Sequence, residues 1–227
     1  MSSVLSQTPR SRVKRLHERG RYDFDTVAAI LDSGFLCHVG YAIDGKPYVT
    51  PTSYWREGDH VYWHGSRASR ALLASEDAEV CLTVTLLDAL VLARSGFHHS
   101  ANYRSVMVFG RAQRVEEPAA KLERMRVFIE RLYPGRWDEL RPVTRKEINA
   151  TTVLSLPIEE ASAKIRSGGP IDDTEDYALP IWAGVVPLRI AVGKPEADPR
   201  NIAGVEVPGY LRRTRIGGVF KGSEYLK

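Results

Sequence analysis

The sequence predicts a mainly β domain built as an antiparallel barrel with a few peripheral helices. Three observations carry this prediction: apolar and polar residues alternate with a period of two in several segments, tight turns join consecutive segments, and few helical segments intervene. The clearest turn is Asp44-Gly45, a dipeptide typical of two-residue hairpins. No βαβ unit with a glycine fingerprint is present, so a Rossmann dinucleotide site is not expected.

The first half of the chain begins with a short helix and continues as strands. Asp23 or Asp25 caps the helix, and Gly34 ends it. Ser66 is the candidate cap of a second short helix, over 66–75. The alternating pattern predicts strands over 35–43, 48–55, 60–64 and 80–86.

The second half contains one long helix and further strands. Leu122, Met125, Phe128 and Leu132 recur at helical spacing and predict a helix over 118–132. Glycine, proline and aspartate make 168–176 a loop. The remaining predicted strands are 103–115, 151–156, 163–165 and 181–192.

Composition and cysteine content exclude several classes of protein. With 227 residues, of which 43% are hydrophobic and 26% charged, the chain has the composition of a folded domain and not of a disordered one. It has no run of about 18 uncharged apolar residues and no secretory signal, so we expect a cytoplasmic protein without a membrane partner. Cys37 and Cys81 are too few for a disulfide framework, and their apolar neighbours predict buried thiols.

The positive charge is concentrated near the N-terminus. Residues 10–21 hold six basic side chains and one acidic one, against a net charge of +4 for the whole chain. Such an arm could bind phosphate or nucleic acid, or it could be an extension that packs on the body or on a partner subunit. We favour the second interpretation and expect no nucleic-acid partner. The predicted division is a basic arm over 1–22, a barrel domain over 23–192 and an extension over 193–227.

A cationic corner is predicted where a strand gives way to a helix, in the segment His64-Gly65-Ser66-Arg67-Ala68-Ser69-Arg70. Unpaired amides at a helix start, hydroxyls and two arginines suit a phosphate group. The alternative is a plain serine cap flanked by two solvated arginines. The spacing alone does not separate these interpretations.

A second polar segment runs from Arg94 to Ser105, between two apolar strands. Its density of polar side chains suits a ligand pocket. His98 and His99 are adjacent, so in a strand they would point to opposite faces, and no metal site is expected. No Gly-x-Ser-x-Gly elbow is present, which argues against a serine hydrolase. Trp182 is either a core residue or a wall against a flat ligand.

Together these segments resemble the FMN-binding split-barrel superfamily of pyridoxamine 5′-phosphate oxidases, in particular its flavin-nucleotide-binding branch, which is related to nitroimidazole-resistance reductases. The resemblance spans roughly residues 10–192. The segments that carry it are RGRYD (19–23), LCHVG (36–40), VTPT (49–52), HGSRASR (64–70), LARS (92–95), HHSANYRS (98–105), PIEEASAK (157–164) and PIWAGVVPL (180–188).

The resemblance implies a six-stranded split β-barrel and a homodimer with FMN at the subunit interface. The flavin ring would meet the strand of Val49, Thr50, Pro51 and Thr52 mainly through its backbone. On the same protomer the remaining contacts implied are His64 at the ring edge, Gly65, Ser66, Ser69 and Arg70 at the phosphate, and Thr85 in the cleft. From the partner chain they are Arg104, Ser105 and Trp182. Arg70 replaces a lysine common in relatives.

The expected function is that of an FMN-dependent oxidoreductase, passing electrons from a reduced donor such as NADH or NADPH to a small nitroaromatic or quinone-like acceptor. His64 is the candidate catalytic residue, able to hydrogen-bond or protonate an acceptor. His98, His99 and Lys164 are weaker candidates for the open side of the pocket. The basic and aromatic pair that grips substrate phosphate in true pyridoxamine phosphate oxidases is not found, which argues against that activity.

Three alternatives stay open. The same fold could hold haem or a deazaflavin, the protein could be a non-catalytic flavin carrier or sensor, or the basic arm could bind nucleic acid. A spectrum, a turnover assay and salt-dependent binding separate them.

Overall fold

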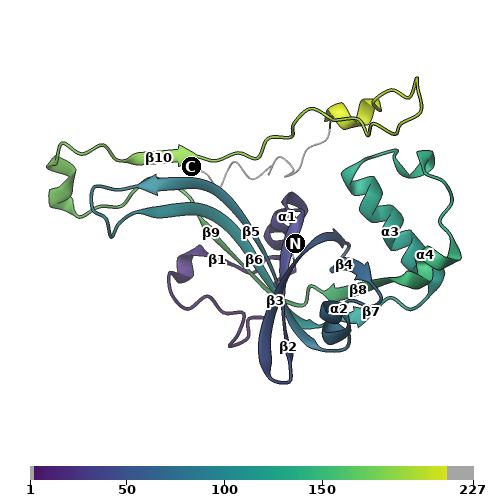
Figure 1. Cartoon of the computed structure of the whole chain (residues 1–227). Helices are drawn as coiled ribbons and strands as arrows, with labels where there is room; N and C mark the ends of the chain where they lie inside the picture. The colour runs from purple at the N-terminus through teal and green to yellow at the C-terminus, as the bar shows by residue number, and fades with distance from the viewer. Residues whose placement is uncertain (1–2, 214–227) are drawn as a thin grey trace.

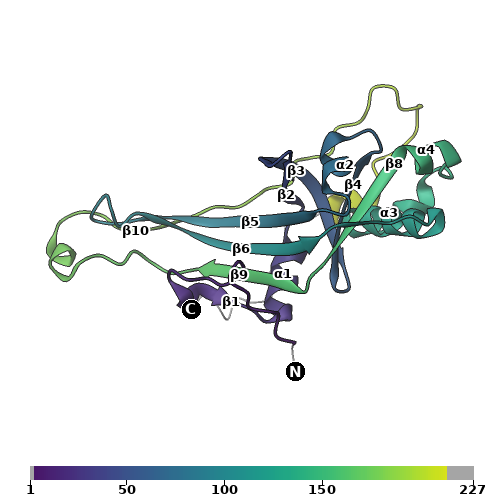
Figure 2. The same ribbon diagram turned by 90° about the horizontal axis from the view of Figure 1, so that it is seen from below.

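The structure is a computed structural model and describes residues 3–213 of the chain. Within this range one antiparallel sheet of ten strands curls on itself, with the path β1-β9-β6-β5-β2-β3-β4-β8-β7 and β10 paired to β5 (Figures 1 and 2). The mainly β, antiparallel architecture is therefore confirmed. The expected count of six strands is not, because short edge strands such as β1 and β7 extend the sheet. The strand bounds are β1 Gly20–Arg21, β2 Leu36–Ile43, β3 Lys46–Glu57, β4 His60–Ser66, β5 Glu79–Leu92, β6 Ser100–Arg111, β7 Gln113–Arg114, β8 Thr151–Pro157, β9 Glu160–Arg166 and β10 Gly184–Pro187.

Helix α1, Phe24–Ser33, plugs one end of the curled sheet. Asp23 caps it, since its Oδ1 accepts from the Thr26 amide at 2.8 Å. Val27, Ile30 and Leu31 are fully buried against the strands. The helix stops at Gly34, where a Cβ would lie only 2.5 Å from the Tyr54 hydroxyl. The sequence signals for this helix and its end are confirmed.

The β2–β3 hairpin turns at Asp44-Gly45, as predicted. Both residues have positive φ, 50° and 73°, which is the backbone of a tight primed turn. The register runs from Ile43↔Lys46 to Leu36↔Ser53 without a shift. The hairpin is therefore longer than its predicted strands.

Strands β3 and β4 separate halfway along their length. They pair only from Glu57↔His60 to Tyr54↔Trp63, whereas β4 follows β8 to the end, Ser66↔Thr151. Because β4 continues to Ser66, the helix predicted to start there begins later: α2 spans Arg70–Ser75, with Ser69 as its N-cap. A gap thus opens between the first half of β3 and the corner of β4 and α2.

Strands β5 and β6 extend beyond the barrel as a long arm, with β10 along one edge (Figure 1). The polar segment over 94–105 is therefore the tip of this hairpin and the start of β6. The predicted strand over 181–192 shrinks to β10, because only Gly184–Pro187 pairs with β5. The register of β5 and β6 shifts between Leu87 and Ala89, which marks a bulge at Asp88.

Helix α3, Pro118–Leu132, has the bounds that the sequence predicted and covers the other face of β3 and β4. Its Phe128 forms a second core with Trp55 and Val153, separate from the barrel interior. Helix α4, Arg145–Ala150, follows, and Thr144 and Glu147 cap it reciprocally. Short 3₁₀ turns occur at His17–Arg19, Trp137–Glu139, Thr174–Ala178 and Gly209–Arg213.

Both terminal segments make contacts with the body within the described range. Leu5 and Ser11 are buried, and Arg10 pairs with Glu160 and Glu79, so the first part of the basic arm packs on the sheet. At the other end the Tyr210 hydroxyl donates to Glu139 at 2.6 Å. The last residues of the predicted extension, 214–227, fall outside the described residues. None of the helices within 3–213 has the length and apolarity to cross a bilayer.

Candidate functional site

The corner between β4 and α2 holds the predicted phosphate ligands. Ser69 makes no side-chain capping bond, so its hydroxyl is not used by the helix. Ser66 accepts from the Ala68 amide at 3.3 Å instead. Helix α2 has only six residues, and its dipole is correspondingly small. The positive potential at this corner therefore comes from side chains.

Arg67 and Arg70 supply that potential. Both are exposed, and neither has a carboxylate within ion-pair distance among residues 3–213. The Arg70 guanidinium lies 5.3 Å from the centroid of the Tyr48 ring. Most arginines of the described chain are paired with acids, so two uncompensated cations at one corner favour an anionic ligand there.

A cavity of about 80 Å³ lies in the gap between β3 and this corner. Thr50, Thr52, His64, Gly65 and Ser69 line it. It is well below the roughly 300 Å³ at which ligand pockets begin, so it can take one small group and not a complete cofactor. Anything larger anchored here must extend out of the gap.

The edge of β3 that faces the gap has unpaired backbone groups. The Tyr54 amide donates to the Phe35 carbonyl, which fixes even-numbered residues as those bonded to β2. Odd-numbered residues 47–53 therefore direct their amides and carbonyls away from β2, where β4 has already departed. Pro47 and Pro51 fit this pattern, since a proline nitrogen needs no partner at an edge. Val49 and Ser53 are left as the two amide donors of that edge.

His64 follows Trp63, the last residue of β4 that pairs with β3. Its ring packs between Trp55 and Phe128, with centroids at 5.9 and 5.0 Å. Burial lowers its pKa below the ordinary histidine value. A lowered pKa favours the neutral imidazole, which can still hydrogen-bond an acceptor, and the catalytic role of His64 stays a prediction.

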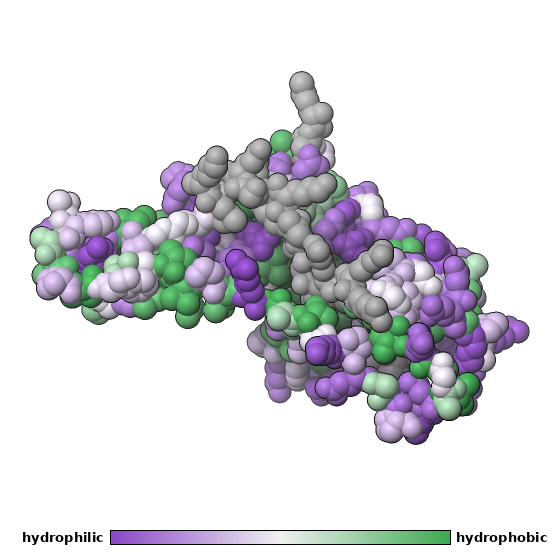
Figure 3. All heavy atoms as spheres, turned by 90° about the horizontal axis from the view of Figure 1, so that it is seen from above, coloured by the Kyte–Doolittle hydropathy of each residue, from purple (hydrophilic) through white to green (hydrophobic). Residues whose placement is uncertain are grey.

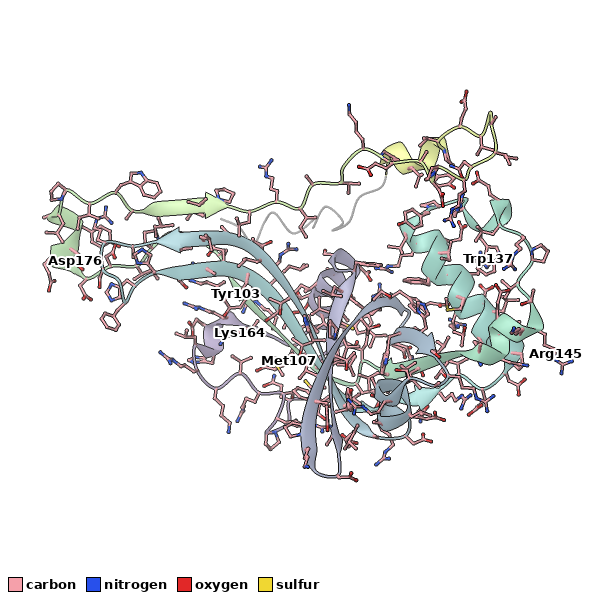
Figure 4. The ribbon with its side chains drawn as sticks, viewed as in Figure 1. Tyr103, Met107, Trp137, Arg145, Lys164 and Asp176 are labelled. Atoms are coloured by element: carbon pink, nitrogen blue, oxygen red, sulfur yellow. The ribbon has the colours of Figure 1, made fainter. Side chains whose placement is uncertain are left out.

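Thr85 and Ser105 are direct partners across β5 and β6, and Lys164 of β9 is the partner of Ser105. These three side chains therefore share one face of the sheet. Figure 4 shows Tyr103, Met107 and Lys164 along this same β6–β9 region. Two strand spacings, about 10 Å, separate β5 from β3, so this group is apart from the arginine corner within one protomer.

Arg104 points to the opposite face from Ser105. It is held by Asp88, the bulged residue of β5. Arg104 and Asp88 border an open groove of about 800 Å³ between the end of α1, β5 and residues 188–190.

Trp182 lies at the outer part of the arm, just before β10. It is 67% exposed and precedes Gly184 by two residues; the Gly184↔Leu92 pair already lies seven residues along β5 from Thr85, about 23 Å away. Within one chain the structure does not bring Trp182 to the arginine corner. Hydrophobic spheres recur along this arm in Figure 3, and Phe97 at its tip is 99% exposed.

His98 and His99, the weaker candidates, lie at the arm tip. His98 is 3.7 Å from Asp172, whose buried carboxylate also accepts from the Arg94 guanidinium and amide at 2.9 Å each. Ligand-type atoms of His98, Asp172 and Asp176 come within 4.8 Å of one another. Because Arg94 already occupies Asp172, the group serves to join the hairpin tip to the loop before β10. His99 is exposed and bonds the Ser95 carbonyl.

Sequence reasoning missed Asp88 and Trp55. Asp88 is the one charged residue in the apolar run 86–93, and that isolation was a usable signal for a buried ion pair. Trp55 had no such signal, since its contact with His64 depends on how α3 packs on the sheet. His38 was also passed over; it is exposed between Pro51 and Thr83 on the face that carries Thr85.

The chain is similar to several known proteins. A protein-family model described as pyridoxamine 5′-phosphate oxidase matches residues 23–165. The solved structure of the flavocytochrome Anf3 from Azotobacter vinelandii is 53% identical with a TM-score of 0.89, covering 92% of this chain and 98% of that one. The FAD and heme binding protein from Mycobacterium smegmatis is 37% identical with a TM-score of 0.82, covering 86% and 97%.

A more distant structure shares the fold alone. A candidate 5-nitroimidazole antibiotic resistance protein from Bacteroides thetaiotaomicron is 19% identical with a TM-score of 0.54, and the match covers 64% of this chain and 86% of that one. No curated protein matches the sequence.

Proposed function

The chain belongs to the pyridoxamine 5′-phosphate oxidase family, and from this we propose that it is a flavoprotein that passes electrons from a reduced donor to a small acceptor. The observation that carries the proposal is the pair of uncompensated arginines, Arg67 and Arg70, beside an unpaired strand edge. The two arginines suit a phosphate by their charge, and the free amides and carbonyls of the strand edge suit the amide-like edge of a flavin ring. A bound flavin would supply the electron transfer, while the protein binds and orients it.

The residues of the corner fit one phosphate and the start of a planar group. The 80 Å³ cavity has room for a phosphate beside Ser69, which lines it, and Arg70 is the next residue along the chain. Val49 and Ser53 would donate their amides to carbonyl oxygens of the ring along the edge of β3. This arrangement favours FMN, whose one phosphate matches this cationic corner.

We further propose that the site is completed by a second copy of the chain. Trp182 is too far from the arginine corner to share a ligand with it in one protomer, and the arm that bears Trp182 projects away from its own barrel (Figure 1). A homodimer in which each arm reaches the other barrel would unite Trp182 with the arginine corner. The exposed apolar residues Leu87, Leu90, Phe97 and Val186 on the arm support such an interface.

A protein with FAD and haem is the second candidate. It is favoured by the two similar structures described as a flavocytochrome and as an FAD and heme binding protein. The open groove of about 800 Å³ beside Leu36, Leu188 and Ile190 has the volume and apolar walls of a cofactor pocket.

The visible spectrum of the purified protein tests both candidates. A flavin absorbs near ~450 nm and haem gives a stronger band near ~400 nm. Chromatography of the released cofactor then separates FMN from FAD. Addition of NADPH or NADH with a nitroaromatic or quinone acceptor distinguishes turnover from a carrier role. Colourless protein that takes up neither flavin contradicts the proposal.

A further inference from the structure

Two ring nitrogens with no hydrogen-bond partner are buried in neighbouring aromatic rings behind the candidate site. They are Nδ1 of His64 and Nε1 of Trp55, and neither has a partner among the described residues. The two rings lie 5.9 Å apart between centroids, and the Trp55 side chain is 1% exposed. Buried polar atoms are almost always satisfied in folded proteins, so this pair requires a common explanation.

The chemistry of the two rings favours one arrangement. An indole nitrogen can only donate a hydrogen bond, whereas a neutral imidazole has one donor and one acceptor nitrogen. A proton on Nδ1 would place two buried donors together, with only the Phe128 ring on the other side. An unprotonated Nδ1 instead supplies the acceptor that Trp55 needs, through a water molecule shared by both atoms.

We infer that Trp55 is a positioning residue that holds His64 neutral, with its proton on Nε2, through one buried water molecule. With Nδ1 unprotonated, the proton of the neutral ring lies on Nε2, which is not among the buried atoms without a partner. His64 also lines the small cavity in the gap. This role rests on the proposed function: His64 then acts as a fixed hydrogen-bond donor toward a ligand in the gap and not as a charged acid.

The charges around His64 do not oppose this arrangement. Burial is the only cause that lowers its pKa. On α3, Arg124 pairs with Glu57 and Arg131 pairs with Asp32, so both arginines are engaged away from the imidazole. The partner of His64 on β8 is Val153, which is uncharged. Arg67 and Arg70 on the α2 side would disfavour a second positive charge, which also favours the neutral ring.

Nitrogen NMR of histidine-labelled, flavin-free protein tests the inference independently of cofactor binding. The His64 signals are identified by their loss in His64→Asn. At pH 7 they are expected to show a neutral ring protonated at Nε2. A charged ring, or a proton on Nδ1, overturns the inference.

Trp55→Phe removes the donor while it keeps an aromatic ring in the second core. Because the bond to Nδ1 exists only for the neutral ring, its loss should raise the pKa of His64 by about half a unit to one unit and allow the other tautomer to appear. Trp63→Phe is the matched control, since Trp63 is equally buried but belongs to the barrel core. An unchanged His64 in Trp55→Phe rejects the positioning role.

If Trp55→Phe does not fold, the Trp55 indole proton of the unsubstituted protein gives the answer. It should show magnetisation transfer from a bound water and slow exchange with solvent. An indole proton in contact with no water contradicts the shared molecule.

Discussion

Asp88 and Arg104 form a two-bond ion pair across the bulge of β5 and β6, with Nε 2.9 Å from Oδ2 and Nη2 2.7 Å from Oδ1. Both side chains are largely buried. The Asp88 carbonyl also accepts from the Leu188 amide at 2.9 Å, so one residue orients the arginine and anchors the segment after β10.

Asp88→Asn should destabilise the fold, because it leaves the Arg104 charge partly buried without its carboxylate. We expect the free energy of unfolding to fall by about 1–3 kcal/mol. Urea unfolding at pH 7 measures it. Asp138→Asn, an exposed change on the turn after α3, is the control and should have no effect. Equal stability of both variants would mean that the pair contributes nothing.

Arg70→Ala should weaken FMN binding by about 10–100-fold, since it removes a charge-assisted bond to the phosphate. Arg70→Lys keeps the charge and should lose less. Titration of flavin-free protein with FMN, followed by fluorescence quenching, measures the affinity. Lys14→Ala, an exposed cation on the N-terminal arm, is the control. Full affinity in Arg70→Ala would place the phosphate elsewhere.

Mixed dimers test whether two chains build one site. Arg70→Ala and Trp182→Ala should each bind flavin poorly alone, because every site lacks one contributor. A heterodimer of the two has one intact site and one doubly altered site, so about half of the sites should recover. Differently tagged chains, co-expressed and purified through both tags, allow the flavin content to be measured. No recovery would show that Arg70 and Trp182 do not serve the same site.

Asp32 of α1 forms ion pairs with β3 and α3, and the loss of stability on removing its carboxylate should depend on pH. Burial raises the pKa of its carboxyl, but hydrogen bonds and charges from Arg56 on β3 and Arg131 on α3 outweigh burial and hold the pKa below the usual value. A depressed pKa stabilises the fold above the unfolded value of about 3.9, and this stabilisation is lost as the pH falls through the folded value.

Asp32→Asn should therefore reduce the free energy of unfolding by about 1 kcal/mol at pH 7. The difference from the parent protein should shrink as the pH is lowered from 5 toward 2. Urea unfolding at several pH values measures this difference. A difference in the free energy of unfolding that grows on acidification would contradict the depressed pKa of Asp32.

The thiols should be inert in the folded protein. Burial raises the pKa of Cys37 to about 12 and also raises the pKa of the half-buried Cys81. Since the thiolate is the reactive form, neither should react with a disulfide reagent at pH 8 until urea unfolds the chain. The absorbance of the coloured thiolate released from the reagent measures the extent of the reaction. Fast labelling of one cysteine under native conditions would show that its strand opens.

Local signals in the sequence predicted the elements whose causes lie within a few residues. The Asp23 cap, the Asp44-Gly45 turn and the bounds of α3 belong to this group, and the arginine corner was also found from its own segment. Each depends on backbone chemistry that a short window of sequence contains.

Features that depend on distant pairing were not predicted. β4 extends beyond its predicted end because β8 pairs with it as far as Ser66↔Thr151. Arg94 meets Asp172 78 positions further along the chain, and no spacing rule relates them. The free edge of β3 could have been suspected, because Pro47 and Pro51 stand at alternate odd positions of an otherwise regular strand.

That edge has an evolutionary consequence. Amides and carbonyls belong to every residue type, so recognition through Val49 and Ser53 survives replacement of either side chain, and only a further proline there would abolish it. Homologues could diverge freely along this stretch and keep the same ligand. Conservation scores would then rank these positions low, although they would touch the proposed ligand.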